Sequence, residues 1–422
     1  MRPSAALLLL LVVDARKAHE HKHVPSDALR ALAANVSWPE VSVDCTLDVD
    51  YAARRITLVT AGGARATVLG NGTADAPRAL PPGPPVLCER RGAGGGGGTR
   101  RAALTIATDL GYVNDWALYL WNKLCFCARE RLDLLLFLGT FPSARADSPR
   151  CARGEAGDHW IKAVAIRYAL EAAGVEEVLV MDTDAIFRRE SFARPGLLDC
   201  YFAAVRSSGA SAGAGAEHYQ VFVNAAVLLV RRTEWSAALL RLWWGDRCGD
   251  KDQLILWHAL FTLWGLAEPR LGYEDGALLD YVSRNYSAGT TMHYKQARRV
   301  VVFEYVRRAW PALLRPGAAA GVWHLRTDAR LDFPDFALLP MAPFPKPPSC
   351  AAAGGDLPPF RAVPSAKHRP TTKHKSFITH TKHRPDFDCC PAGDLVAPAC
   401  VAVALPPVAR ADGDNAPHRR LS

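Results

Sequence analysis

The sequence predicts an α/β fold in which a mostly parallel sheet is flanked by helices. Through residues 99–342, short apolar segments alternate with longer segments of helical pattern, as in α/β layer structures. The apolar run 178–181 follows a glycine that ends a helical segment, and this is typical of a buried parallel strand. Hydrophobic residues make up 49% of the 422 residues and charged residues 22%, which is enough apolar material for a sizeable core.

The first 18 residues are expected to be a signal peptide or a short membrane anchor. A charged start precedes the apolar run 5–13, and small residues follow it, as in secretory signal peptides. The run is shorter than the roughly 20 apolar residues that a membrane span needs. Three N-glycosylation sequons agree with passage through the secretory pathway: Asn35, Asn71 and Asn285.

Residues 19–98 are expected to form a stem or small accessory region. They contain short strand-like segments, and Cys45 and Cys88 are candidates for a disulfide in an oxidising compartment. A proline-rich segment at 81–85 and the glycine run 94–98 then interrupt regular structure. A boundary is therefore expected directly after the glycine run.

The expected elements then follow in order along residues 99–342. Strands are expected at 102–108, 132–138, 178–181, 198–205, 219–230 and 321–325. Helices are expected at 116–129, 159–172, 233–244 and 251–264, with Asp158 and Thr233 as caps of the second and third. Ligands of such sheets bind at the carboxyl ends of the strands, so the site is expected beyond residues 108 and 181.

Residues 343–422 are expected to be a disordered tail, proline-rich at first and then basic and rich in histidine. Lysine and arginine lie between these histidines and would repel a cation, which favours a solvated tail over a metal-binding tract. The net charge of +9 is concentrated toward the two ends of the chain. No basic stripe with interleaved aromatic residues lies between them, so no nucleic-acid partner is expected.

Asp182 and Asp184 are the main candidates for chemistry, because they directly follow the apolar strand at 178–181. Two carboxylates at positions i and i+2 can both reach one hard divalent cation. One interpretation is a cation that binds the diphosphate of a sugar nucleotide and neutralises charge on that leaving group. The alternative is a phosphatase in which Asp182 attacks a phosphoryl group and Asp184 is its acid/base. The mid-domain position of the pair disfavours the phosphatase.

The segment from His159-Trp160-Ile161-Lys162 to Phe187 resembles the central block of GT-A glycosyltransferases, in particular glycosyltransferase family 34, whose members transfer galactosyl, xylosyl or mannosyl residues in the Golgi. The likeness continues in order through Asn224-Ala225-Ala226, Arg232-Thr233-Glu234-Trp235-Ser236, Trp243-Trp244, Asp252-Gln253 and His324. It covers roughly residues 100–330. It implies a Rossmann-like GT-A domain at 99–342 and a retaining, metal-assisted transfer of a hexosyl or pentosyl residue to a glycan or glycoprotein, in the Golgi lumen or at its membrane.

The resemblance also implies a role for each matching residue. Asp182 and Asp184 would bind Mn²⁺ or Mg²⁺, with His324 as the third ligand and His293 as the rival candidate. The nucleotide of a UDP- or GDP-sugar would lie against Thr108, Asp109 and Tyr112, with its diphosphate near Lys162. The donor sugar and the acceptor would face the catalytic candidates Asn224, Asp252 and Gln253.

Structural roles remain open for some of these residues. Asn224 could be a satisfied structural amide, Asp252 a helix N-cap, and His324 a histidine packed on its strand. The tryptophans Trp121, Trp257 and Trp264 could stack on an acceptor sugar, although their helical spacing favours the core. The chain has Ala226 where the family has glycine, and it lacks the family's glycine after His324. These departures leave open a degenerate member that binds sugars without turnover.

Overall fold

The computed structural model describes residues 23–33, 36–51, 53, 55–69, 83–92, 99–141, 158–187, 196–207, 209–216, 223–248, 252–269, 273, 278–279, 303–311, 314–316, 323–325, 330–339, 350 and 378–380. The expected signal peptide and glycine run, the three sequon asparagines and His293 all lie outside these residues. So does the tail beyond residue 342, apart from Cys350 and residues 378–380.

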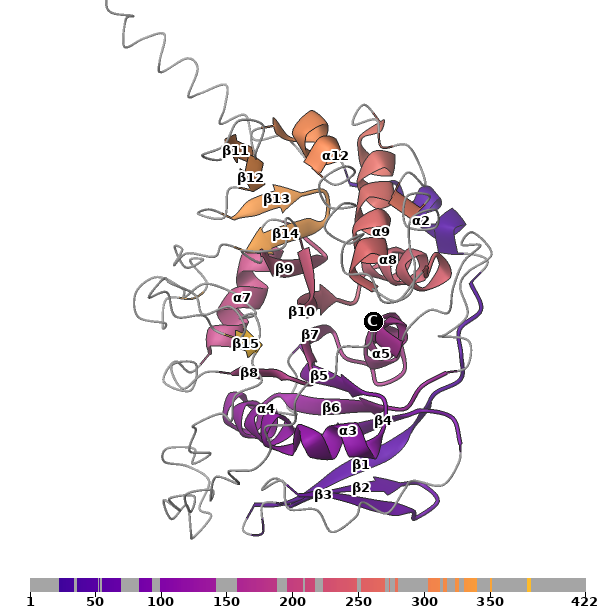
Figure 1. The fold of residues 1–422 in the computed structure, drawn as a ribbon, viewed down its shortest axis with the longest axis vertical. Helices are drawn as coiled ribbons and strands as arrows, with labels where there is room; N and C mark the ends of the chain where they lie inside the picture. The colour runs from indigo at the N-terminus through magenta and orange to yellow at the C-terminus, as the bar shows by residue number, and fades with distance from the viewer. Residues whose placement is uncertain are drawn as a thin grey trace, which may run out of the picture.

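One 11-stranded sheet organises the molecule (Figure 1). Its strands are, in spatial order, β13 (Leu331–Phe333), β14 (Phe336–Leu339), β9 (Ala212–Ala216), β10 (Val223–Arg231), β7 (Glu177–Asp182), β5 (Arg101–Ala107), β6 (Asp133–Leu138), β4 (Val86–Arg90), β1 (Ser42–Asp50), β2 (Arg55–Thr60) and β3 (Arg65–Leu69). At its centre β5 runs parallel to both β6 and β7. The adjoining strands β10 and β4 run antiparallel to β7 and β6.

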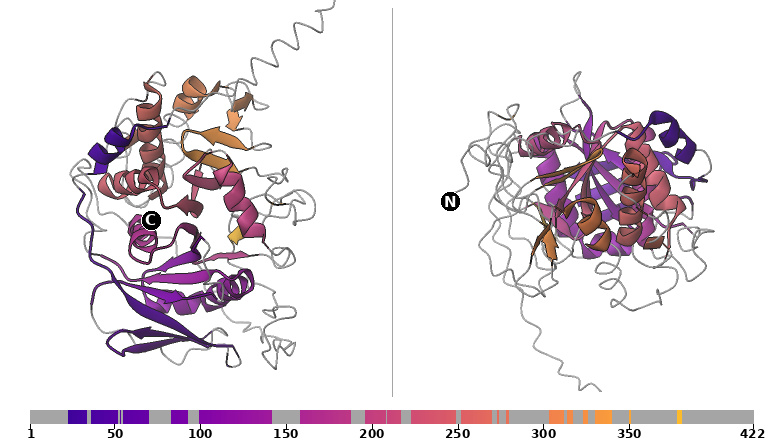
Figure 2. Two further views of the ribbon diagram at one scale, coloured as in Figure 1. Left: turned by 180° about the vertical axis from the view of Figure 1, so that it is seen from behind. Right: turned by 90° about the horizontal axis from the view of Figure 1, so that it is seen from above.

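Helices cover both faces of this sheet, as the views from behind and above also show (Figure 2). One face packs against α2 (Ser26–Ala33), α5 (Ile161–Glu171), α8 (Glu234–Gly245) and α9 (Asp252–Ala267). The other packs against α3 (Leu110–Asp115), α4 (Ala117–Glu130) and α7 (Leu197–Arg206). Strand β5 serves both cores, with Leu104 facing the first and Ala103 the second. The predicted α/β class, a sheet flanked by helices, is confirmed. The sheet is mixed rather than mostly parallel, because β5–β6, β5–β7, β1–β4 and β9–β14 pair in parallel and its other six pairings are antiparallel.

The strand expected at 198–205 is wrong, because this segment is the helix α7. It begins after Gly196, whose φ of 72° is in the left-handed region, and nearly every side chain along it is buried. A continuous apolar run without polar alternation fits a fully buried helix as well as a buried strand. The other strands and helices expected in residues 99–342 are found where the structure describes them. The starts of three of them, residues 219–222, 251 and 321–322, lie outside the described residues. Asp158 lies within a short 3-10 helix, η2 (Asp158–Trp160), that leads into α5, while Thr233 caps α8 as expected.

Strands from both sides of the boundary expected near residue 99 share this one sheet. β4 pairs with β6 on one side and with β1 on the other, so the strands of residues 42–90 extend it. The predicted Cys45–Cys88 disulfide is confirmed, and it links β1 to β4 across a sequence separation of 43 residues. Cys125 and Cys248 are also disulfide-bonded, whereas Cys127 is a free, buried thiol.

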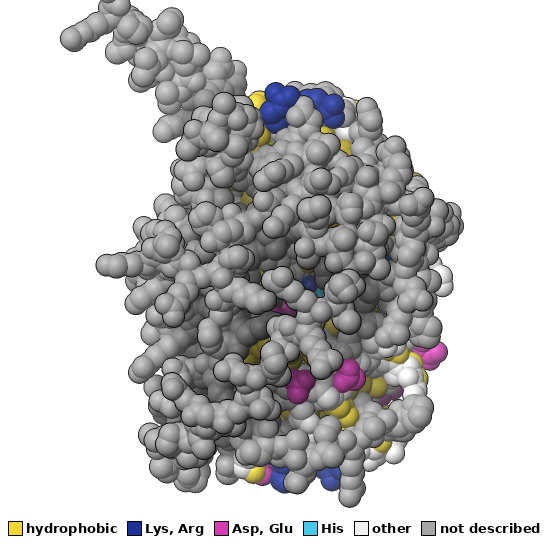
Figure 3. All heavy atoms as spheres, in the orientation of Figure 1, with side chains coloured by type: hydrophobic (Ala, Val, Ile, Leu, Met, Phe, Trp, Pro, Cys, Tyr) yellow, Lys and Arg dark blue, Asp and Glu magenta, His cyan; other side chains and the backbone are white. Residues whose placement is uncertain are grey.

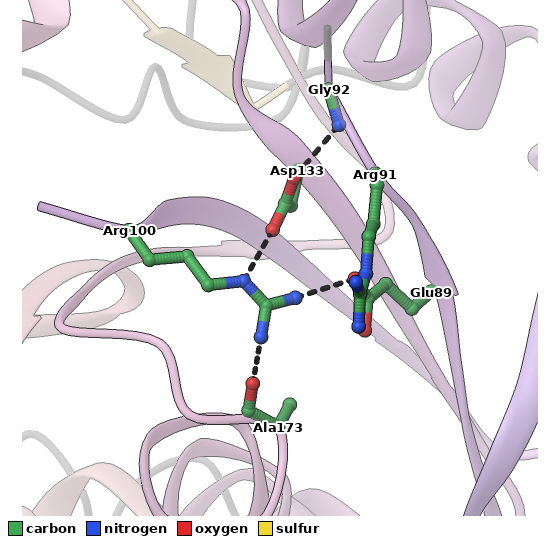
Figure 4. A network of polar contacts seen from close by, with 6 residues as sticks. All are labelled: Glu89, Arg91, Gly92, Arg100, Asp133 and Ala173. Carbon is green, nitrogen blue, oxygen red and sulfur yellow. Dashed lines mark hydrogen bonds and ion pairs between the residues drawn. The ribbon is translucent and has the colours of Figure 1, made fainter. Parts of the chain in front are cut away.

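A polar network fastens the two ends of the glycine-rich connection between β4 and β5 (Figure 4). The Arg100 Nε donates to Asp133 Oδ2 at 2.8 Å, and the same guanidinium reaches Glu89 and the carbonyl of Ala173. The other oxygen of Asp133 accepts from the backbone N–H of Gly92 at 2.7 Å. Both ends of the connection are thereby held on the first residue of β6.

Two smaller sheets and a short helix complete the described structure. β11 (Leu314–Pro316) pairs with β12 (Trp323–Leu325), and β8 (Ala185–Phe187) pairs with β15 (Ile378–His380). β15 belongs to the tail, so this three-residue segment departs from the disorder expected there. The helix α12 is Phe303–Ala309. None of the helices in the described part of the chain is long and apolar enough to cross a membrane.

Candidate functional site

The candidate site lies where β5 and β7 end side by side. In the register of these two strands Ile106 is opposite Asp182, so the residues following β5 and the Asp182–Asp184 turn emerge at the same edge. Both strands are parallel, and this edge is their carboxyl end. The structure therefore brings Thr108, Asp109, Asp182 and Asp184 to one edge, as the sequence predicted.

In the Asp182–Asp184 turn, the middle residue faces the protein interior and the two aspartates are partly exposed. Thr183 is buried at 4% exposure, while both neighbouring aspartates are half-buried. The Thr183 hydroxyl donates to the carbonyl oxygen of Ile106, which ties the turn to β5. The two carboxylates consequently flank a buried anchor and remain within reach of solvent.

Lys162 joins the first of these aspartates to the start of α9. Its ammonium lies 2.7 Å from Asp182 Oδ1 and 3.2 Å from Asp252 Oδ2. The Nζ also donates to the carbonyl of Ala225 on β10 at 3.5 Å. Only 10% of the Lys162 side chain and 7% of the Asp252 side chain are exposed. Burial disfavours the charged amine, but the two carboxylates outweigh it and raise the pKa of Lys162.

Asp252 and Gln253 are both buried in the first turn of α9. The Asp252 carbonyl accepts from the indole N–H of Trp243 at 2.9 Å, which fixes this turn against α8. On β10, the Asn224 side-chain oxygen accepts from the backbone N–H of Ala226 at 2.8 Å. Such a contact is typical of a structural amide, and a contact of Asn224 with the sugar stays a prediction.

Tyrosines of α3 and α4 stand close to the aspartates. Asp109 caps α3, since its Oδ1 accepts from the Tyr112 backbone N–H at 2.8 Å and its other oxygen accepts from Thr108 at 2.9 Å. Burial and then the charge of Asp184 raise the pKa of Tyr112 to about 12. The same two causes raise the pKa of Tyr119 to about 12. Both phenols are therefore neutral hydrogen-bonding groups at physiological pH.

Two residues that the sequence analysis missed lie beneath the turn. Asn122 and Lys123 are fully buried in α4, and Lys123 Nζ donates to the carbonyl of Thr183 at 2.8 Å. Burial lowers the pKa of Lys123 to about 7, although Asp184 and Asp182 oppose this shift. A signal was present in the sequence, because a consecutive polar pair inside an apolar helix must find buried partners.

The remaining candidates are three tryptophans, which lie in the core, and His324, whose side chain is outside the described residues. The tryptophans considered as acceptor platforms are core residues: Trp121, Trp257 and Trp264 are all buried. His324 lies on β12, opposite Arg315 of β11, and its side chain is outside the described set. Its role as a third metal ligand therefore stays a prediction.

The donor set can be compared with the needs of a divalent cation. Within the part of the chain that the structure describes, no three His, Cys, Asp or Glu side chains are grouped so as to hold a metal. Mg²⁺-type ions are commonly held by one or two carboxylates together with phosphate oxygens and water. Asp182 and Asp184 fit that kind of site. They do not supply a complete all-protein site.

Charges are mixed on the face seen in Figure 3. The described basic side chains visible there lie at its upper and lower ends and, in small part, in the hollow near its middle, and acidic side chains lie in its middle and lower parts. The helix α12, which carries the exposed arginines Arg307 and Arg308, lies toward the upper end of this view (Figure 1). The described residues of this face thus form no continuous basic stripe.

No protein-family model matches the chain, and no curated protein matches it. Among solved structures, the chain is similar to one described as a "crystal structure of a glycosyltransferase involved in the glycosylation of the major capsid of PBCV-1". The similarity has a TM-score of 0.27 and 12% sequence identity, and it covers 34% of this chain and 65% of that chain. A TM-score this low carries no argument about function, so the function has to be argued from the geometry of the site.

Proposed function

We propose that the protein is a glycosyltransferase of GT-A type. It transfers a hexosyl or pentosyl residue from a nucleotide-diphosphate sugar, such as a UDP- or GDP-sugar, to a glycan or glycoprotein. The transfer retains the anomeric configuration and takes place in the secretory pathway, in the Golgi lumen or at its membrane. The sequence resemblance supports the class, and the arrangement at the carboxyl edge of β5 and β7 supports the chemistry.

One observation carries the proposal: Lys162 is held between Asp182 and Asp252, at 2.7 and 3.2 Å. In glycosyl transfer the bond from the anomeric carbon to the diphosphate breaks, and negative charge develops on the departing diphosphate. A buried ammonium beside a pair of carboxylates that can hold a cation would place positive charge where this charge develops. It would also hold the start of α9 next to the donor site.

Asp182 and Asp184 are the residues that would hold Mn²⁺ or Mg²⁺. When bound, the cation would neutralise charge on the diphosphate. Lys162 would add a second positive charge, since its pKa is raised. Asp109 and Tyr112, linked through the α3 cap, would border the nucleotide. Asn224, Asp252 and Gln253 would lie toward the transferred sugar, where the Trp243 contact and the Ala226 contact limit their movement.

The test is a panel of UDP- and GDP-sugars, with Mn²⁺ or Mg²⁺, scored for nucleotide release and for thermal stabilisation of the protein. We expect one donor to be consumed in a cation-dependent reaction. The Asp184→Ala variant should lose this reaction while it keeps its melting temperature within a few degrees. Asp48→Ala is the matched control, because Asp48 is an exposed aspartate on β1 with 69% of its side chain accessible. It should retain full activity.

Other outcomes would identify the alternatives. A phosphoaspartate at Asp182, or hydrolysis that needs Mg²⁺ but no nucleotide, would establish an aspartate-nucleophile phosphatase. Cation-dependent UDP binding without transfer to any acceptor and without donor hydrolysis would indicate a degenerate sugar-binding protein. Normal turnover by a folded Asp184→Ala protein would refute the proposed role of the aspartate pair.

A further inference from the structure

Two consecutive side chains of α4, Asn122 and Lys123, are buried at 0% exposure beneath the segment that joins β7 to β8. The neighbouring buried residues of this part of the helix are apolar: Leu120, Trp121, Leu124, Cys125 and Phe126. Buried polar groups are costly unless they are hydrogen-bonded. A polar pair at this position therefore calls for a local explanation.

Lys123 holds the backbone of that segment, and Asn122 holds the backbone of the strand β8 that follows it. The Asn122 amide makes two hydrogen bonds to Phe187, accepting from its N–H at 2.7 Å and donating to its carbonyl at 2.9 Å. The Lys123 ammonium donates to the carbonyl of Thr183 at 2.8 Å. One helical turn thus fixes the chain both at the Asp182–Asp184 turn and at the end of β8.

The placement of these contacts bears on the two aspartates. Thr183 is held inward by Lys123 on its carbonyl and by the Ile106 carbonyl on its hydroxyl. Its backbone cannot rotate without breaking these buried hydrogen bonds, and a buried polar group left without a partner is destabilising. Asp182 and Asp184 are the residues on either side of this fixed point. Their separation and direction consequently depend on it.

We propose that Lys123 and Asn122 are positioning residues for the aspartate pair. They set the geometry in which Asp182 and Asp184 bind the cation and diphosphate of the donor, without touching either. This inference rests on the proposed function for its binding consequence, but its structural consequence for the turn does not. Groups that orient the ligands of a metal commonly affect affinity by about 10- to 100-fold when they are removed.

The first measurement is the affinity for Mn²⁺ together with UDP, by calorimetry on the full chain. Lys123→Met keeps a long unbranched side chain but removes the donor, and we expect 10- to 100-fold weaker binding. Leu124→Ala is the matched control, because Leu124 is the next residue of α4 and is equally buried, but it faces the apolar core. It should lower the melting temperature and leave the affinity within about twofold of the wild type.

The second measurement is hydrogen exchange of the backbone amides at residues 183–187, which needs no ligand. Lys123→Met should speed exchange there by at least tenfold relative to Leu124→Ala. Lys123→Gln keeps an N–H donor, and it should recover part of both the protection and the affinity. This variant also serves if the methionine protein does not fold.

The two measurements separate the two proposals. If wild-type protein binds no Mn²⁺ with UDP, the proposed function fails, and the exchange data alone decide on positioning. If Lys123→Met and Leu124→Ala change affinity or exchange to the same extent, Lys123 is only a packing residue and the inference is overturned.

Discussion

Replacing Lys123 with methionine should change how the free energy of unfolding depends on pH. Lys123 is fully buried, and burial lowers its pKa from 10.5 to about 7. In the unfolded chain this amine has an ordinary pKa, so between the two values the unfolded state binds more protons than the folded state. The cost of burying the amine is therefore greatest, and constant, below about pH 7, and it disappears as the pH rises toward 10.5.

The size of this effect follows from the shift itself. One pKa unit corresponds to about 1.4 kcal/mol, and the amine is half deprotonated in the folded protein at pH 7. Integrated from pH 7 to pH 9, the proton linkage raises the stability of the wild type by about 2 kcal/mol. The Lys123→Met protein lacks this contribution. All other titratable groups contribute almost equally to both proteins, so the difference between the two stability curves isolates Lys123.

The assay is urea unfolding of both proteins at pH 7, 8 and 9, with Leu124→Ala as a control that lowers stability equally at every pH. We expect the wild type to gain about 2 kcal/mol relative to Lys123→Met between pH 7 and pH 9. A difference that stays constant over this range would refute the reasoning. It would show that the amine keeps its ordinary pKa inside the protein, and that the burial of Lys123 is offset by its aspartate neighbours.

Three further changes have defined expected outcomes. Lys162→Met leaves the carboxylates of Asp182 and Asp252 without the ammonium group that they share. It should lower the free energy of unfolding, measured in urea, by about 3–5 kcal/mol, and adding Asp252→Asn should recover part of that loss. The double variant Cys45→Ser and Cys88→Ser removes the disulfide and opens a loop of 43 residues. It should lower the free energy of unfolding in urea by about 4 kcal/mol, and an unchanged urea midpoint would contradict this. Asn122→Ala deletes both hydrogen bonds to Phe187, and it should speed exchange of the backbone amides at the end of β8. The amides of α7 serve as the internal control, and their exchange should not change.

The sequence predicted the centre of the fold well because that region obeys strong local rules. The run 178–181 has no polar residue to place outside, and it is the buried strand β7. Thr233 offers a side-chain oxygen directly before an apolar helix, and it caps α8 through the backbone N–H of Ser236 at 3.1 Å. The segment 198–205 lacked such a rule, because an unbroken apolar run fits either element when both of its sides are covered.

At the site, too, residues marked by the local sequence pattern could be predicted, whereas contacts that depend on tertiary packing could not. Asp182 and Asp184 could be found from the sequence because a strand pattern points directly at them. The ion pairs around Asp182 could not be assigned in this way, since Lys162 reaches both Asp182 and Asp252 only after α5 and α9 pack on one face of the sheet. Lys123 was missed for a similar reason: its contact with Thr183 joins residues 60 positions apart.

The central claim is that the Asp182–Asp184 pair supports cation-dependent use of a nucleotide sugar. The most direct measurement is nucleotide release from the UDP- and GDP-sugar panel, with and without Mn²⁺, by the wild type, Asp184→Ala and Asp48→Ala proteins in parallel. We predict release from at least one donor by the wild type and Asp48→Ala, none without the cation, and none by folded Asp184→Ala. Equal release by all three proteins, or release that is indifferent to the cation, would contradict the claim.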